Sequence, residues 1–379
     1  VAGKGRCGPR PPAAGLRAAA ALLCAAAAGL TAACGASPHP GPSGAGAAGR
    51  SAPAGPISET GSSLLYPLIR AWAAGYARQA AGATVTTKST SSGAGIAAAS
   101  AGTADLGASD AFLSSGDLVK SPDLLNIPLA VSAQTVIYNL PGVSSTARVR
   151  LNGTLLAGIY DGTITKWNDP RLTAVNPRVN LPAVKIVPVL RSGSSGDTFL
   201  FTSYLSTQDQ QWDDSIGYGT TAKWPPVAGE QTAKGSLAVL QACQSAPGCV
   251  AYNGISYLAQ ARADGLGEAQ LANAAGQYTL PTAAALQAAT ASFVSLTPAN
   301  ETISMIDGPA AAGYPIVNYE YAVVSIRQPS AARASALRAF LRWVITAGNQ
   351  PSYVDAVGFQ PLPADLVTLG RQQIAEIGR

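Results

Sequence analysis

Apolar residues recur at helical spacing directly after a short Gly/Ser segment that begins at residue 61. They share one face of a predicted helix, and they are Leu65, Leu68, Ile69, Trp72 and Tyr76. The segments that follow alternate in pattern: a strand over 84–87, a small-residue helix over 96–101, a strand over 105–108 and a β-rich run over 127–138. This alternation of strands and helices predicts an α/β fold.

A second region with its own helices and strands follows Pro141 and Gly142. Its patterned segments cover 155–160, 184–190 and a helix that opens at Ser195. A β-prone run over 314–325 comes next. It leads into an amphipathic helix with Gly348 as its C-terminal stop, whose apolar face holds Leu337, Phe340, Leu341, Val344 and Ile345.

The order of these segments predicts two lobes. A chain that leaves one lobe near Tyr138 and returns near Pro315 crosses between the lobes twice and encloses a cleft between them. We therefore expect a discontinuous lobe I over 57–138 and 315–379, and a lobe II over 139–314.

The first 34 residues have the pattern of an export signal. Four basic residues precede an apolar run over 18–30, and small residues then lead to Cys34. A transmembrane helix is the alternative, but the run is shorter and richer in alanine than a bilayer-spanning segment. The residues before Cys34 resemble a bacterial lipobox, so we expect cleavage there and a lipid on Cys34. Residues 35–56 are rich in Gly, Pro, Ala and Ser and are expected to form a disordered tether.

Composition and net charge show whether the chain can form a folded core and whether nucleic acid is an expected binding partner. With 47% hydrophobic residues in 379, the chain can bury a sizeable core. It holds 25 Lys and Arg against 20 Asp and Glu, and four of the basic residues lie in the leader. Without the leader the net charge is about +1, which gives no reason to expect nucleic acid as a partner.

The cysteines fall into two groups. Cys7 and Cys24 lie in the leader with Cys34 at its end, whereas Cys243 and Cys249 form a close pair further along. In an exported protein such a pair is most simply a local disulfide. Zinc is the alternative, but no further cysteine or histidine lies nearby to complete four ligands.

Three Gly/Ser segments precede helix-patterned runs, at 61–64, 91–95 and 191–198. The first turn of a helix has unpaired N–H groups and a partial positive charge, and glycine allows close approach to the backbone. Together with Arg191 and Asp110, these helix starts could enclose a small tetrahedral anion. An arginine at a strand end can donate two hydrogen bonds to an oxyanion.

Each of these features also has a simpler interpretation. Most Gly/Ser loops are ordinary turns, and Arg191 could be a solvated residue at a strand end. Asp110 could cap a helix, and Asp197 could do no more than interact with a helix dipole.

The sequence argues against catalysis. The only histidine, His39, lies in the predicted tether, which excludes a Ser-His-Asp or Cys-His system built from folded residues and any His-based metal cluster. No phosphate-binding P-loop or nucleophile elbow occurs, so we expect no cofactor and no metal. A hydrolase that used Ser195 with a lysine base remains an alternative that no spacing supports.

Several motifs together resemble the phosphate-binding proteins of bacterial ABC phosphate transporters, the PstS family, and in particular its lipid-anchored members from actinobacteria. In chain order they are GSSLLYP at 61–67, SGAGI at 92–96, GASD at 107–110, IYDG at 159–162, KWND at 166–169, RSGSSGDTF at 191–199 and FTSYL at 201–205. The resemblance covers residues 57–365. It implies a two-lobed type II periplasmic-binding-protein fold that closes on phosphate in a cleft between the lobes.

The resemblance also implies site residues. Ser63 and Leu64 would bind phosphate from the first helix start and Ser92 from the second, while Asp110 would accept the proton of the ligand. From lobe II would come the side chains of Arg191 and Ser195, the N–H of Gly196 and the position of Asp197. The Cys243–Cys249 pair matches a cysteine pair of mycobacterial relatives.

One residue departs from the family pattern. The family commonly has an aspartate two residues after the arginine, and this chain has Gly193 there. We therefore expect Arg191 to be freer and locally more positive.

These observations predict an extracytoplasmic, lipid-anchored, monomeric receptor that delivers phosphate to a membrane permease. The alternatives are a receptor for another oxyanion, such as sulfate, molybdate or a phosphonate, or a secreted phosphatase or surface adhesin.

Overall fold

The computed structural model describes residues 55–379. The predicted signal over 1–34, its lipid site Cys34 and the tether up to residue 54 lie outside these described residues. Within them, no helix is both long enough and apolar enough to cross a membrane.

A large mixed sheet runs through the described part of the chain, with the strand order β2-β1-β3-β12-β4-β8-β6-β7 and β9 paired to β4. Its strands are β1 (Ile57–Gly61), β2 (Val85–Thr86), β3 (Leu106–Ser109), β4 (Leu124–Tyr138), β6 (Val187–Arg191), β7 (Gln231–Ala233), β8 (Cys249–Gly254), β9 (Gly267–Glu268) and β12 (Val317–Ser325). A small sheet combines β5 (Arg150–Leu151), β10 (Gln270–Ala272) and β11 (Tyr278–Thr279).

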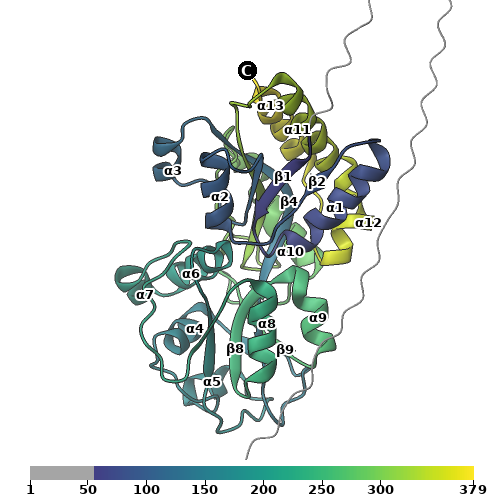
Figure 1. Ribbon diagram of the computed structural model, residues 1–379. Coiled ribbons are helices and arrows are strands. Elements are labelled where there is room, and N and C mark those ends of the chain that lie inside the picture. Colours follow the sequence, from purple (N-terminus) through teal and green to yellow (C-terminus); the bar gives the residue numbers. More distant parts are fainter. Residues whose placement is uncertain (1–54) are drawn as a thin grey trace, which may run out of the picture. The chain divides into compact units, whose positions relative to one another are not determined.

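β4 belongs to two sets of strands. Its residues up to Ala133 pair with β12, and its residues from Gln134 onward pair with β8. We call β1, β2, β3, β12 and the N-terminal part of β4 the first half of the sheet. The second half comprises β6, β7, β8, β9 and the C-terminal part of β4. Figure 1 shows β4 between helices of the two halves.

Helices surround both halves of the sheet (Figure 1). With the first half lie α1 (Tyr66–Gln79), α2 (Ser92–Ser100), α3 (Ser115–Lys120), α11 (Ala331–Val344), α12 (Pro351–Val354) and α13 (Ala364–Glu376). With the second half lie α4 (Gly153–Tyr160), α5 (Pro170–Val175), α6 (Gly196–Gln208), α7 (Gln210–Ser215), α8 (Ser236–Ser245) and α9 (Leu258–Ala263).

The apolar face predicted for the first helix is buried. In α1, Leu68 and Trp72 are fully buried, and the indole Nε1 of Trp72 donates to the carbonyl of Gly348 at 2.7 Å. The role predicted for Gly348 is wrong. α11 ends at Val344, and Gly348 lies in the 3₁₀ turn η3 (Ala347–Asn349), where a Cβ would stand 3.1 Å from the Trp72 indole. Gly348 therefore serves close packing.

An aromatic cluster fills the second half and fixes the end of β6. The rings of Phe201 and Tyr252 stack at 4.4 Å, and Tyr160 packs edge-on against Phe201. The hydroxyl of Tyr252 accepts a hydrogen bond from the backbone N–H of Arg191 at 2.9 Å. The core thus sets the position at which the strand delivers Arg191.

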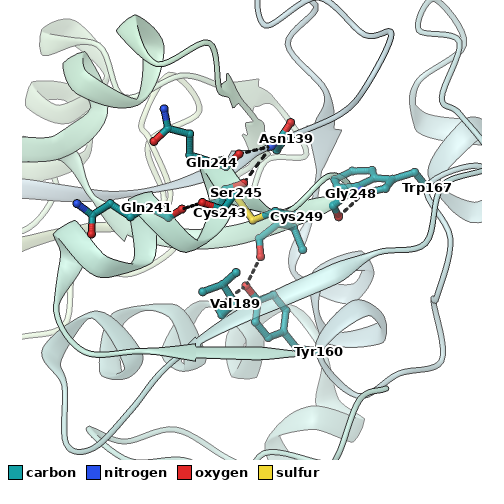
Figure 2. The surroundings of a disulfide bond; sticks show 11 residues. Asn139, Tyr160, Trp167, Val189, Gln241, Cys243, Gln244, Ser245, Gly248 and Cys249 are labelled. Carbon is teal, nitrogen blue, oxygen red and sulfur yellow. Dashed lines mark hydrogen bonds between the residues drawn. A yellow bond between two sulfur atoms is a disulfide. The ribbon is translucent and has the colours of Figure 1, made fainter. Parts of the chain in front are cut away.

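The predicted disulfide joins Cys243, in α8, to Cys249, the first residue of β8. Figure 2 shows it beside Asn139, whose side-chain amide donates to the carbonyls of Cys243 and Gln244. On the other side, the indole of Trp167 donates to the carbonyl of Gly248 at 2.9 Å. The bridge therefore ties the end of a helix to the start of the next strand.

The segment around α10 (Ala283–Ala291) contacts the first half, although the sequence analysis assigns it to lobe II. Gln287 donates to Gln360 at 2.9 Å, and the side chain of Asn126 in β4 donates to the carbonyl of Glu301 at 3.4 Å. The lobe boundaries remain a prediction, and these contacts favour a return to lobe I before Ala283.

Candidate anion-binding site

Four buried serines from four turns or helix starts meet between the two halves of the sheet. Ser63 lies in the turn between β1 and α1, Ser92 is the first residue of α2, Ser195 precedes α6, and Ser236 opens α8. None of the four side chains is more than 3% exposed. Each of these helices is long enough for its first turn to present unpaired N–H groups.

Asp110 directly follows β3 and faces two of these turns. Its carboxylate accepts hydrogen bonds from the hydroxyls of Ser62 and Ser92, the latter at 3.1 Å. Ser92 in turn accepts from the backbone N–H of Asp110 at 3.2 Å. Asp110 does not cap a helix, because α3 begins at Ser115 and has Ser114 as its cap. Its carboxylate therefore lies against the turns that hold Ser62 and Ser92.

The pKa of Asp110 is raised to about 6, mainly by burial and in addition by the nearby charge of Asp197. Hydrogen bonds from Glu320 and Ser62 and the charge of Arg191 act in the opposite direction. Burial also raises the pKa of Glu320 well above its usual range, and the charge of Asp110 adds to that effect. The site thus contains two neighbouring carboxyl groups of which one holds its proton at neutral pH.

Arg191, the last residue of β6, is only 5% exposed, so it is not a solvated arginine at a strand end. One terminal nitrogen donates to the carboxylate of Asp197, and the other donates to the hydroxyl of Ser63 at 3.2 Å. The expectation that Gly193 leaves Arg191 freer is therefore wrong. Asp197 supplies the counter-ion from the first turn of α6.

Asp197 is fully engaged by groups of the protein. Its Oδ2 accepts from Arg191 and from the hydroxyl of Ser236 at 3.0 Å, while Oδ1 accepts from the amide of Gln134 at 3.2 Å. These contacts make it the partner of the arginine. They leave Asp110 as the carboxylate better placed to accept a proton from a bound anion.

Two buried donors at the site have no hydrogen-bond partner among the described residues, namely Nε of Arg191 and the hydroxyl of Ser195. Ser195 precedes α6 without capping it through its side chain. A buried donor left unpaired costs about 1 to 3 kcal/mol, and more when it is charged. An oxyanion that accepted from both would remove this cost.

The two halves touch directly at the site. A Cβ on Gly196 would stand 2.4 Å from Oδ2 of Asp110 and 2.5 Å from the hydroxyl of Ser92, so only glycine fits there. The start of α6 is therefore held against the start of α2.

Leu64 makes a second contact between the halves. It is fully buried, its side chain lies against Gly254, and its carbonyl accepts from Ser256 at 2.7 Å.

A groove of about 740 Å³ lies beside this contact. Its lining includes Gly93 and Phe112 from the first half and Ser194, Phe199 and Tyr218 from the second. Gly93 and Ser194 are the chain neighbours of Ser92 and Ser195, so the groove leads to the edge of the site.

Several residues of the site are not among those predicted from the sequence. The start of α8 has the same signal as the other helix starts, a glycine followed by a serine, at Gly235 and Ser236. Gln134 lies in β4 and Glu320 in β12, two long and mostly buried strands. The only signal in the sequence is that each is a polar residue among apolar neighbours. Ser62 belongs to a quoted motif, and its hydroxyl contacts Asp110.

Comparisons with known proteins point the same way as the geometry. Residues 46–347 match a family model described as a PBP superfamily domain. The chain is 34% identical over 313 residues to a phosphate-binding protein PstS of Xylella fastidiosa, covering 82% of each chain. It is 31% identical over 337 residues to a protein of the same name from Methanocaldococcus jannaschii, covering 83% of this chain and 84% of that one.

A solved structure is similar in fold. It is the periplasmic phosphate-binding protein PfluDING bound with phosphate, with a TM-score of 0.64 and 20% identity. The alignment covers 85% of this chain and 99% of that one.

Proposed function

The chain belongs to the PstS family of phosphate-binding proteins, and from this membership we propose that it captures inorganic phosphate and delivers it to the permease of an ABC transporter. The membership and the shared fold confirm the predicted α/β architecture with two lobes of the type II periplasmic-binding-protein kind. The relatives named above are phosphate-binding proteins.

The observation that carries the proposal is a pair of buried donors without a partner in the described part of the chain, Arg191 Nε and Ser195 Oγ. They lie where helix starts converge, and a charged guanidinium makes the stronger kind of hydrogen bond to an oxyanion. Asp110 supplies the complementary acceptor. A protonated phosphate can donate to it, whereas sulfate would face it with like charge and no proton.

We assign the ligand contacts as follows. Ser63, Leu64 and Ser92 would bind phosphate from the first lobe together with Asp110. Arg191, Ser195 and Gly196 would bind it from the second lobe, with Asp197 as the counter-ion of Arg191. Ser63 also receives hydrogen bonds from Arg191 and from the N–H of Ser236 at 3.1 Å, so it links the helix starts to the arginine.

We also propose that the protein works outside the cytoplasm as a monomer, tethered through a lipid on Cys34. The support is the leader pattern before Cys34 and the disulfide between Cys243 and Cys249, which suits an oxidising compartment. Mass analysis of Cys34 in the membrane fraction tests the anchor, and the mass of the detergent-free protein in solution tests the monomer.

Calorimetric titration of the purified protein with phosphate and with sulfate tests the proposed function. We expect one phosphate per chain and much weaker sulfate binding. Sulfate binding as tight as phosphate binding would favour a different oxyanion receptor. Release of phosphate from a phosphate ester by the same preparation would instead indicate a phosphatase.

A further inference from the structure

Glu320 in β12 is fully buried beside Asp110, a residue that the proposed function assigns to the ligand. The register of β12 against β3 pairs Tyr321 with Ser109, which brings Glu320 next to Asp110. The side-chain amide of Asn318 links the two, because it donates to the carbonyl of Asp110 at 3.1 Å and to Oε1 of Glu320 at 3.0 Å.

Glu320 has one carboxyl oxygen with hydrogen-bond partners and one without. Oε1 accepts from the side-chain amide of Asn318 and lies 2.5 Å from the hydroxyl of Ser132, whose single proton is shared between this oxygen and Oδ1 of Asn318. Oε2 faces no donor among the described residues. The carboxylate of Asp110 lies next to it, and a protonated Oε2 can donate a hydrogen bond to that carboxylate. Two carboxyl groups can form such a bond only when one of them is protonated.

We propose that Glu320 is a positioning residue that stays protonated, donates its proton through Oε2 to the Asp110 carboxylate, and thereby keeps Asp110 an anion ready to accept the proton of bound phosphate. The proposal rests on the proposed function. It makes selectivity for a protonated anion depend on a side chain that does not touch the ligand.

The surrounding charges favour this assignment of the proton. Asp110 faces Glu320 from the end of β3, and Tyr321 lies next to it on β12. Beyond Asp110 stand Arg191 of β6 and Asp197 of α6, which pair with each other. β4 contributes Ser132, a neutral donor. Arg191 is thus already paired with Asp197, so it is not the main counter-ion of Asp110. A protonated Glu320 is the acidic group beside Asp110 that can donate a hydrogen bond to it.

Loss of the Glu320 donor changes the protonation of Asp110. Without a proton donated to it, a buried carboxylate is less stable, so its pKa rises. A protonated Asp110 is itself a donor and accepts sulfate as readily as phosphate. A variant without this donor should therefore show a lower phosphate-to-sulfate affinity ratio than the parent. The midpoint of the fall of this ratio with decreasing pH should also shift to a higher pH.

The experiment measures phosphate and sulfate affinities of the purified protein from pH 5 to pH 8.5 for the parent, Glu320→Gln and Glu320→Met. The glutamine keeps a donor at the Oε2 position and an acceptor at Oε1, whereas methionine has similar volume and neither. We expect Glu320→Gln to keep the parental phosphate-to-sulfate ratio. We expect Glu320→Met to lose about tenfold or more of that ratio near pH 7.5, the equivalent of one lost buried hydrogen bond.

The controls separate this inference from a structural role and from the proposed function. Glu301→Met removes another buried carboxyl, one that faces no donor within the described residues, and should leave the ratio unchanged. Glu320→Ala replaces the methionine variant if that variant does not fold.

Three results would overturn the inference. They are a Glu320→Gln variant as unselective as the methionine variant, equal losses of phosphate and sulfate affinity without a pH shift, and unchanged selectivity in every variant. Absence of phosphate binding by the parent would instead refute the proposed function.

Discussion

Arg191 and Asp197 form an ion pair with both side chains almost fully buried, at 2% and 0% exposure. The pair joins the end of β6 to the first turn of α6, six residues later. A buried pair costs desolvation energy but fixes the direction of both groups, so the guanidinium keeps Nε free for the site. The pair as a whole carries no net charge because Asp197 neutralises Arg191. The N–H groups of the helix starts and the serine hydroxyls therefore supply much of the attraction for an anion.

Replacing Arg191 should weaken phosphate binding, and it should also lower the stability of the fold because Asp197 loses its buried counter-ion. We expect Arg191→Ala to lose tens- to thousands-fold in phosphate affinity. The reason is that removing one partner of a buried charged pair between protein and ligand costs about 2 to 5 kcal/mol of binding free energy. Arg191→Lys should lose less, since lysine keeps the charge but cannot donate from a planar fork. Calorimetric titration and a thermal melt of both variants measure this. An alanine variant with parental affinity would remove Arg191 from the site.

Asp110→Asn should lower selectivity for phosphate over sulfate by tens- to thousands-fold. Asparagine can donate as well as accept, so it removes the like-charge penalty that sulfate meets, about 1 to 3 kcal/mol or more. In the parent the same selectivity should fall as the pH drops below about 6, where Asp110 takes up a proton. Competition titrations between pH 5 and pH 8 check both statements. An unchanged ratio in Asp110→Asn would place selectivity elsewhere.

The disulfide between Cys243 and Cys249 should stabilise the fold without affecting the ligand. The bridge closes a loop with a sequence separation of 6, for which the chain-entropy model gives about 2 to 3 kcal/mol or less. We expect Cys243→Ser/Cys249→Ser to lower the free energy of unfolding by up to this amount and to keep parental phosphate affinity. Two alkylatable thiols in the native exported protein would contradict the bridge.

Burial raises the pKa of Glu301 to about 9 from 4.5, and neither carboxyl oxygen has a partner among the described residues. Below pH 4.5 both the folded and the unfolded state hold the proton. Between about pH 4.5 and 9 only the folded state does, so stability falls as the pH rises, by about 1.4 kcal/mol per pH unit at most.

The variant Glu301→Gln should remove this slope. Urea unfolding at pH 5, 7 and 8.5 should show the variant gaining on the parent as the pH rises. Glu376→Gln, at the exposed end of α13, is the matched control and should follow the parent. A constant difference between Glu301→Gln and the parent at all three pH values would contradict the raised pKa.

The hydrophobic pattern predicted the described helices and strands that carry the site, because their buried faces follow helical or strand periodicity. The strand end at Arg191 lies where the pattern places it, whereas α2 begins at Ser92 and not at residue 96, so the second Gly/Ser segment forms the first turn of the helix. Gly348 was misinterpreted because a glycine after a helix commonly stops it, whereas here the neighbouring Trp72 requires its small size. Such a packing need depends on residues far away in the chain.

The site could be predicted only in part, for a similar reason. Gly/Ser helix starts are local signals, and Gly235 and Ser236 carry the same signal at the start of α8. The pairing of Asp197 with Arg191 and the contact of Glu320 with Asp110 arise from strand register and helix placement. A glutamate within the buried run of β12 is nonetheless a signal in itself, because a buried carboxyl group needs a partner.

The division of β4 between two sets of partners couples the folding of the two lobes. Its N-terminal part is the last strand of one half, paired with β12, and its C-terminal part pairs with β8 and β9 in the other half. Unfolding of either half would therefore disrupt β4, the strand that both halves share. We therefore expect the two lobes to unfold as one cooperative unit, and a lobe expressed on its own would lack a strand that completes its core.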